Sequence, residues 1–237
     1  CVDPAKNLQE RLDRGLATVY FSATLLPVQY YKQLLSTRTD NYAVYAESVF
    51  SPNQRLLAVG TDVSSLYTRR TEAEYQRMAS YIKKTASAQQ GNYLVFFPSY
   101  QLMQDVFTCF LQQNLGKMDC IIQESNMTEQ KREEFLEEFQ KERKQSLVAF
   151  GVMGGIFSEG IDLREEQLIG VLIVGTGLPQ ICTEREILRR YYEKQNGMGF
   201  DYAYLYPGMN KVLQAAGRLI RTSKDYGVIA LLDERFL

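Results

Sequence analysis

Apolar runs long enough for buried strands alternate along this chain with runs whose apolar residues recur at helical spacing. The helical runs cover 71–84, 101–116, 127–143 and 183–195. Near-continuous apolar strands separated by helices predict an α/β fold, in which helices cover both faces of a mostly parallel sheet and make three layers. The strand-like runs are 92–98 (NYLVFFP), 119–123 (DCIIQ), 146–151 (SLVAFG), 168–175 (LIGVLIVG) and 227–233 (GVIALLD).

Local signals refine this pattern at three places. Residues 17–23 (ATVYFSA) are rich in β-formers and precede a turn, so they predict a further strand. Thr128 stands where the N-cap of the 127–143 helix is expected. Residues 36–70 are less regular and contain Pro52, which favours either an edge strand or long surface loops.

Composition restricts the function more than it restricts the fold. The 237 residues are 45% apolar and 23% charged, which is typical of a globular domain of this size. A formal net charge of -1 excludes a bulk polycation, so any contact with nucleic acid has to come from local patches. The chain has no histidine, which excludes Ser-His-Asp and Cys-His nucleophile systems and histidine-ligated zinc.

Cysteine spacing and hydropathy indicate a cytoplasmic protein. No apolar run reaches the roughly 18 residues of a membrane span, and no signal peptide opens the chain. The four cysteines are scattered and never form C-x-x-C, which predicts reduced, buried thiols. Because the first residue is cysteine rather than methionine, we expect the chain to be part of a longer one.

The stretch QAAGRLIR (214–221) combines an amide, small residues and two arginines. If residues 211–221 form a helix, Gln214, Arg218 and Arg221 fall at i, i+4 and i+7 on one stripe. Either that stripe is a solvated surface whose arginines pair with carboxylates, or its planar guanidinium groups form an anion site. A second, apolar stripe that could pack on the sheet is formed by Leu213, Gly217 and Ile220.

Three further stretches stand at the ends of predicted strands, where ligands of parallel sheets bind. The run 151–163 (GVMGGIFSEGIDL) is either a glycine-rich turn or a backbone cradle for phosphate, and it holds an acidic pair around Gly160. Ser22 and Thr24 form either a polar strand end or a contact to phosphate. Ser99 and Tyr100 form either a helix cap with a packed ring or a platform on which a base stacks.

Taken in chain order, these stretches resemble a known family. FSATL, LVFFPSY, FSEGIDL and QAAGRLIR, followed by GVIALLDERF, are similar to motifs III, IV, V and VI of superfamily 2 helicases, most closely those of the DinG/XPD type. The resemblance covers essentially the whole chain, and SEGIDL and QAAGRLIR are its most specific parts. It implies a RecA-like fold of the P-loop NTPase type.

The departures from the family pattern concern its first motor domain. The phosphate loop G-x-x-x-x-G-K-[ST] and the acidic Mg²⁺ box are absent. The resemblance therefore implies that residues 1–26 are the tail of the first helicase domain and that 27–237 are the second. Relatives with an iron–sulfur cluster carry its four cysteines in the first domain, and this sequence has no such group. Residues 164–166 (REE) replace the small turn expected after motif V.

The resemblance also assigns roles around an ATP whose Mg²⁺ complex is held mainly by the first domain. It implies that Gln214, Arg218 and Arg221 approach the γ-phosphate across a cleft. Motif V is expected to face the ribose, and motif III to couple nucleotide state to domain closure. The motif V residues are Glu159, Gly160 and Asp162; the motif III residues are Ser22, Ala23 and Thr24.

The partners implied are single-stranded DNA and the first helicase domain. Ser99, Tyr100, Gly154 and Gly155 are expected to contact the DNA backbone. A different possibility is a nucleic-acid-binding domain that kept the fold without the motor. A free-standing nucleotide-binding enzyme is disfavoured by the missing phosphate loop.

Overall fold

The computed structural model describes residues 2–113, 116, 118–155, 157, 163 and 167–237. The chain forms two compact units. One comprises Cys1–Ser48 and Leu178–Asn210, and the other, called here the sheet unit, comprises Val49–Gly177 and Lys211–Leu237. The predicted domain boundary after residue 26 lies inside the first of these units and stays a prediction.

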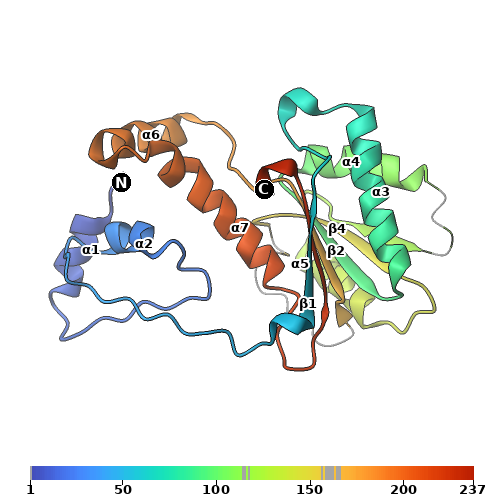
Figure 1. The fold of residues 1–237 in the computed structure, drawn as a ribbon, viewed down its shortest axis with the longest axis horizontal. Coiled ribbons are helices and arrows are strands. Elements are labelled where there is room, and N and C mark those ends of the chain that lie inside the picture. The colour runs from blue at the N-terminus through green and yellow to red at the C-terminus, as the bar shows by residue number, and fades with distance from the viewer. Residues whose placement is uncertain (1, 114–115, 117, 156, 158–162, 164–166) are drawn as a thin grey trace. The chain divides into compact units, whose positions relative to one another are not determined.

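The sheet unit is built on one six-stranded sheet in the order β1-β6-β5-β2-β4-β3 (Figure 1). Every neighbouring pair is parallel, with Tyr93 opposite Val148 and Gly170 at the centre. The prediction of an α/β fold with a mostly parallel sheet is therefore confirmed. The strands are β1 (Arg55–Gly60), β2 (Asn92–Phe97), β3 (Asp119–Ile122), β4 (Leu147–Val152), β5 (Gly170–Val174) and β6 (Gly227–Leu232).

Helices α3 (Glu72–Ala88) and α4 (Tyr100–Leu111) cover one face of the sheet (Figure 1). Alternate strand residues on this face pack against them; Phe97 and Phe150 lie with their ring centroids 5.8 Å apart in a stacked arrangement. Phe110 of α4 meets Phe150 edge-on. Each central strand is covered by helices on both faces of the sheet, and this explains why these strands are apolar without interruption.

The opposite face is covered by α5 (Glu129–Glu137) and by the last residues of α7 (Tyr206–Ala216). Phe135 of α5 stacks on Phe157 at a centroid distance of 4.2 Å, and Phe157 lies beside Gly151 of β4. Ala215 of α7 is fully buried. The helix predicted over 127–143 ends earlier, and a short 3-10 helix, η3 (Glu138–Gln140), continues it.

Capping hydrogen bonds set the starts of three of these helices. Thr128 accepts from the backbone N–H of Lys131, so its predicted N-cap role is confirmed. Thr71 and Ser99 cap α3 and α4 in the same way. The irregular region 36–70 contains the edge strand β1, preceded by η1 (Pro52–Gln54) and followed by η2 (Tyr67–Arg69); a last 3-10 turn, η6 (Glu234–Phe236), follows β6.

The first unit is helical and rich in tyrosine. The ring of Tyr30 lies about 5 Å from those of Tyr31, Tyr202 and Tyr206, the distances being 5.0, 4.9 and 5.0 Å. Burial raises the pKa of Tyr30 to about 12, in keeping with its place at the centre of this cluster. The helical elements are α1 (Ala5–Leu12), α2 (Val28–Leu35), α6 (Thr183–Asn196) and a π-helical turn (Asp201–Leu205) that leads into α7.

Two sequence predictions are wrong in this part of the chain. Residues 17–23 form no strand: none of the described strands pairs with them, and most of their side chains are exposed, Phe21 to 90%. A β-prone segment without a partner strand leaves its backbone groups to solvent. The cysteines that the structure describes, Cys109, Cys120 and Cys182, are free thiols; of these three only Cys109 is buried, while Cys182 at the start of α6 is exposed. No described helix has the length and apolar character needed to cross a membrane.

Candidate functional site

The predicted site residues of the sheet unit lie at two separate edges of the parallel sheet. Ser99 and Tyr100 follow β2, and Gly154 and Gly155 follow β4, so both pairs lie at the carboxyl ends of neighbouring strands. Arg221 precedes β6, at the opposite edge where the strands begin. The two predicted functions therefore fall on opposite edges of one sheet.

At the carboxyl edge, Ser99 and Tyr100 open α4. The Ser99 hydroxyl accepts from the N–H of Leu102 at 3.3 Å, which is the capping role that the sequence left open. Tyr100 occupies the first helical position and is 37% exposed. Its ring is therefore partly packed and partly available to a ligand.

The glycine loop after β4 comes close to these residues. Gly154 has a φ of 71°, which a residue with a side chain rarely adopts. A Cβ atom on Gly154 would lie 3.3 Å from Cε of Lys211. The N–H of Gly155 donates to the carbonyl of Val152 at 3.2 Å and closes a tight turn. The predicted glycine-rich turn is thus present, with a lysine side chain beside it.

One residue that the sequence did not single out joins these two loops. Gln123 directly follows β3 and is 3% exposed. Its Oε1 accepts from the N–H of Val152 at 2.9 Å, and its Nε2 donates to the hydroxyl of Tyr100 at 2.8 Å. The available signal was a single amide directly after the apolar residues of the run DCIIQ.

At the opposite edge, the predicted helix over 211–221 is shorter than expected. α7 ends at Ala216, and the next two backbone bonds, from Arg218 to Ala215 and from Leu219 to Ala216, both span three residues. Gly217 stands where the helix ends, which suits its low helix propensity. The single stripe predicted for Gln214, Arg218 and Arg221 is therefore wrong.

The burial of this region also differs from the prediction. The buried residues are Val212, Ala215 and Leu219, whereas Leu213 of the predicted apolar stripe is 37% exposed. Gln214 and Arg218 are half-buried, and Arg221 is exposed. Arg221 thus extends from a loop rather than from a helix face.

A buried carboxylate fixes the backbone of that loop. Asp225 is 1% exposed, and its Oδ2 accepts from the N–H of Arg221 at 2.5 Å and from the N–H of Thr222 at 2.6 Å. Its Oδ1 accepts from the Thr222 hydroxyl at 2.9 Å. We call residues 217–225, held in this way, the arginine loop.

The arginine loop is held from a second side by the residue before β1. Nε2 of Gln54 donates to the carbonyls of Thr222, Ser223 and Asp225, the last at 2.7 Å. Local sequence patterns do not predict this contact, because 171 positions separate Gln54 from Asp225. The loop that carries Arg221 is therefore a defined structure rather than a loose connection.

The remaining predicted site residues divide into two groups. Ser22 and Thr24 lie in an exposed turn of the first unit around Ala23, where the Ser22 hydroxyl accepts from the N–H of Thr24 at 3.2 Å. Glu159, Gly160 and Asp162 lie outside the described residues, as do residues 164–166.

A buried ion pair organises the carboxyl ends of β6 and β1. Asp233 is fully buried and accepts from Nε and Nη2 of Arg235 and from the N–H of Ser65, each at 2.8 Å. Burial alone would raise the pKa of Asp233, but these hydrogen bonds outweigh burial and hold the pKa below its usual value. Arg235 also donates to the Ser65 hydroxyl, so the pair fastens the end of the chain to the loop after β1.

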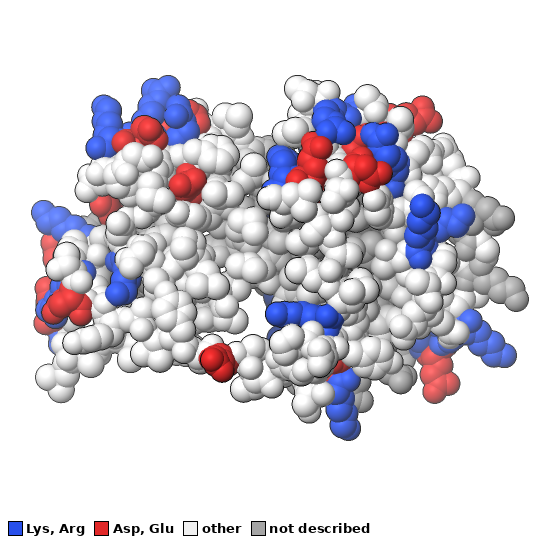
Figure 2. All heavy atoms as spheres, in the orientation of Figure 1, with Lys and Arg blue, Asp and Glu red and all other residues white. Residues whose placement is uncertain are grey.

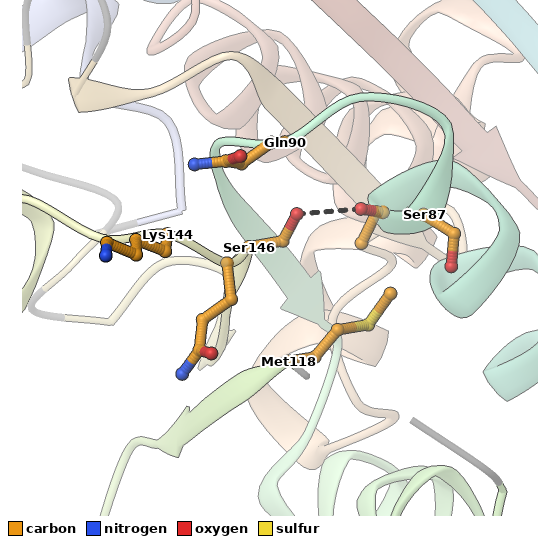
Figure 3. A pocket seen from close by; sticks show the side chains of 7 residues that line it. Ser87, Gln90, Met118, Lys144 and Ser146 are labelled. Atoms are coloured by element: carbon orange, nitrogen blue, oxygen red, sulfur yellow. Dashed lines mark hydrogen bonds between the residues drawn. The ribbon is translucent and has the colours of Figure 1, made fainter. Parts of the chain in front are cut away.

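Two hollows of the sheet unit lie away from the predicted site residues. One of about 310 Å³ is lined by Ser87, Met118 and Lys144 among others, with the Ser146 hydroxyl donating to the carbonyl of Ala86 (Figure 3). A second, of about 560 Å³, lies near Asn92 and Tyr226 at the amino ends of the strands. Within the described ranges, neither is lined by a predicted site residue.

Over the described residues, the face of the molecule shown in Figure 2 carries no single broad field of one charge. Basic and acidic side chains are intermixed over the face in Figure 2, and this face carries no continuous basic band among the residues it describes. In the same part of the chain, no group of three or more cysteine, aspartate or glutamate side chains is placed to hold a metal ion.

Comparison with known proteins decides the family. Residues 82–237 match the family described as the helicase C-terminal domain. The chain belongs to this family. It is 27% identical over 235 residues, 94% of its length, to the ATP-dependent DNA helicase XPD of Sulfolobus acidocaldarius. It is also 27% identical over its whole length to the XPD/RAD3 helicase subunit of the general transcription and DNA repair factor IIH of Saccharomyces cerevisiae.

Solved structures agree with this assignment. An XPD helicase structure superposes on 77% of the chain with a TM-score of 0.64 and 26% identity. The chain is thus an XPD/Rad3-type helicase C-terminal domain of superfamily 2, as the motifs predicted. It spans 40% and 32% of the length of the two relatives named above, so it corresponds to less than half of each.

Proposed function

We propose that this chain is the C-terminal half of an ATP-dependent DNA helicase motor. The observation that carries the proposal is the family match together with the two loops that one sheet holds at opposite edges. The arginine loop offers guanidinium groups for phosphate, and the carboxyl edge offers a hydroxyl and a glycine turn for a nucleic-acid strand. In this proposal residues 1–26 belong to the first helicase domain and 27–237 to the second.

The proposed role of the arginine loop is to stabilise charge on ATP held mainly by the first domain. Phosphoryl transfer depends on positioning and charge stabilisation more than on covalent chemistry, and an arginine supplied from a second domain contributes about 10³–10⁵ in rate in comparable systems. Arg221 suits that role because its backbone is fixed by Asp225 while its side chain is exposed. Arg218 and Gln214 would support it from half-buried positions.

ATP enters as the Mg²⁺ complex, and the metal neutralises phosphate charge when bound. The arginine loop would supply donors for the phosphate oxygens, and the first domain would supply the ligands of the metal. We assign Glu159, Gly160 and Asp162 to the ribose side of that site. We assign Ser22, Ala23 and Thr24 to the coupling of nucleotide state to closure.

The carboxyl edge is proposed to hold single-stranded DNA. Ser99, Tyr100, Gly154 and Gly155 would contact its backbone, which is a largely sequence-independent mode of binding. Gln123 supports this assignment because it joins the two loops by direct hydrogen bonds. A DNA-tracking motor with free thiols would act in the cytoplasm.

The test compares the full-length protein with this chain alone. The full-length protein should hydrolyse ATP faster when single-stranded DNA is added. The isolated chain should show negligible turnover, because its sequence has no phosphate loop, and weak DNA binding that falls as salt rises. Robust Mg²⁺-dependent turnover by the isolated chain would refute the half-motor. DNA binding without ATPase activity in the full-length protein would instead favour a non-enzymatic binding domain.

A further inference from the structure

The direction of the hydrogen bond between Gln123 and Tyr100 is fixed by chemistry. The backbone N–H of Val152 can only donate, so the Gln123 atom 2.9 Å from it must be the carbonyl oxygen. The other end of that side chain is then the NH₂ group, which has no acceptor capacity. The oxygen of Tyr100, 2.8 Å away, must therefore accept.

A phenolic oxygen that accepts one hydrogen bond still has its own proton to donate. Within the described ranges, Tyr100 makes no second hydrogen bond that would use this proton. Tyr100 is 37% exposed, so part of this residue is open to a ligand outside the protein. Gln123, which is 3% exposed, stays behind it and contacts only protein.

An outward-pointing hydroxyl proton suits a ligand that accepts hydrogen bonds. Gln123 lies beside the glycine turn as well as beside Tyr100: a Cβ on Gly155 would lie 3.4 Å from Nε2 of Gln123. A hydroxyl donor beside a glycine turn matches the oxygen of a phosphodiester, which only accepts, better than a base edge, which mixes donors with acceptors.

We propose that Gln123 is a positioning residue that turns the Tyr100 hydroxyl outward to donate to a phosphodiester oxygen of single-stranded DNA. The proposal rests on the DNA contact assigned above and specifies it: Tyr100 acts through its hydroxyl as well as its ring. Gln123 touches no DNA, and its effect is to decide which way the hydroxyl proton points.

Gln123→Glu tests this direction because it keeps both hydrogen bonds of the residue 123 side chain and reverses the donor and acceptor in the one to Tyr100. A carboxylate can still accept from the N–H of Val152, but its second oxygen has no proton and accepts from Tyr100. The proton of the Tyr100 hydroxyl then points inward, and it can no longer donate to the DNA. A role in holding the two loops together would be preserved by this change, whereas a role in orienting the hydroxyl would not.

The experiment measures the affinity of the full-length protein for fluorescein-labelled oligo(dT) by anisotropy, without nucleotide. Tyr100→Phe, Gln123→Glu and the double variant should each bind about tenfold more weakly than the wild type, the typical effect of losing one hydrogen bond to a charged group. The double variant should be no weaker than Tyr100→Phe. The slope of log affinity against log salt should not change for Tyr100→Phe, because no cation is removed.

Tyr81→Phe is the matched control, since it deletes a hydroxyl that donates to Asp62 on a different loop; it should bind as the wild type does. Wild-type affinity in Tyr100→Phe overturns the inference, even if Gln123→Glu does not fold. If the double variant loses affinity for DNA by the product of the two single losses, the inference is also overturned, because that result indicates repulsion of the DNA by the carboxylate introduced at position 123. Absence of DNA binding by the wild type would instead reject the proposed function itself.

Discussion

Removing the carboxylate of Asp225 should disturb the arginine loop more than removing any other single group in it. Asp225→Ala deletes hydrogen bonds from two backbone N–H groups, those of Arg221 and Thr222, and one from the Thr222 hydroxyl. A bond to a charged acceptor contributes about 1.5–3 kcal/mol, and buried donors left without an acceptor add a further cost. Because Arg221 is exposed and water can reach part of the loop, we expect a net loss of about 3 kcal/mol.

The loss should be visible in both stability and catalysis. For a chain of this size, about 3 kcal/mol corresponds to a fall of roughly 6–12 °C in Tm. In the full-length protein, displacement of Arg221 should lower kcat for ATP about a hundredfold, since small misplacements of a catalytic group have effects of that order. The measurements are a thermal melt and a steady-state ATPase assay at saturating single-stranded DNA.

Thr222→Val provides the matched control, because it removes the hydroxyl, which donates to Asp225 and accepts from the N–H of Lys224, and keeps both backbone bonds to Asp225. It should cost about 1 kcal/mol and leave kcat within a few-fold of the wild type. If Asp225→Ala melts and turns over like the wild type, the carboxylate does not hold the loop. If both variants lower kcat equally, loss of the hydrogen bond between the Arg221 N–H and Asp225 is not the cause of the fall in kcat.

Three further changes probe other parts of the structure. Gly154→Ala and Gly197→Ala both place a side chain at a φ of 71° and should cost about 1 kcal/mol each, but only Gly154→Ala should weaken DNA binding, as measured by anisotropy. Because its hydrogen bonds hold the pKa of Asp233 below the unfolded value of about 3.9, they stabilise the fold above that pH, and this stabilisation is lost as pH falls through the lower folded pKa. The difference between Asp233→Asn and the wild type in urea melts should therefore shrink as the solution is acidified. Cys182 should react with a thiol reagent in the native state, and buried Cys109 only after unfolding.

Periodicity in the sequence predicted the sheet unit well because its strands are buried on both faces. A strand such as β2, buried along its whole length, has to be apolar throughout, and that run is visible without a structure. The caps at Thr128 and Ser99 were predictable for a similar reason, since they depend on bonds to residues three positions away.

Local sequence patterns did not predict the parts of the structure that depend on contacts between residues far apart in the chain. Residues 17–23 have strand composition, but a strand also needs a neighbour to pair with, and periodicity carries no information on that. The helix predicted over 211–221 ends at Ala216 because Gly217 follows it and because the distant Asp225 accepts from the backbone N–H of Arg221, a contact that helical spacing does not indicate. Gln54 and Gln123 were missed because isolated amides carry no spacing signal.

The central claim is that this chain supplies arginines to ATP at one edge of its sheet and holds DNA at the other. It is tested most directly in the full-length protein by measuring kcat for ATP and the affinity for single-stranded DNA in Arg218→Ala and Arg221→Ala. Both variants should lose orders of magnitude in kcat with near-normal DNA affinity and Tm, and lysine should rescue poorly because a point charge cannot replace a planar two-pronged contact. Gln214→Ala should have a smaller effect, since it removes a neutral group. Near wild-type turnover in both arginine variants would contradict the account.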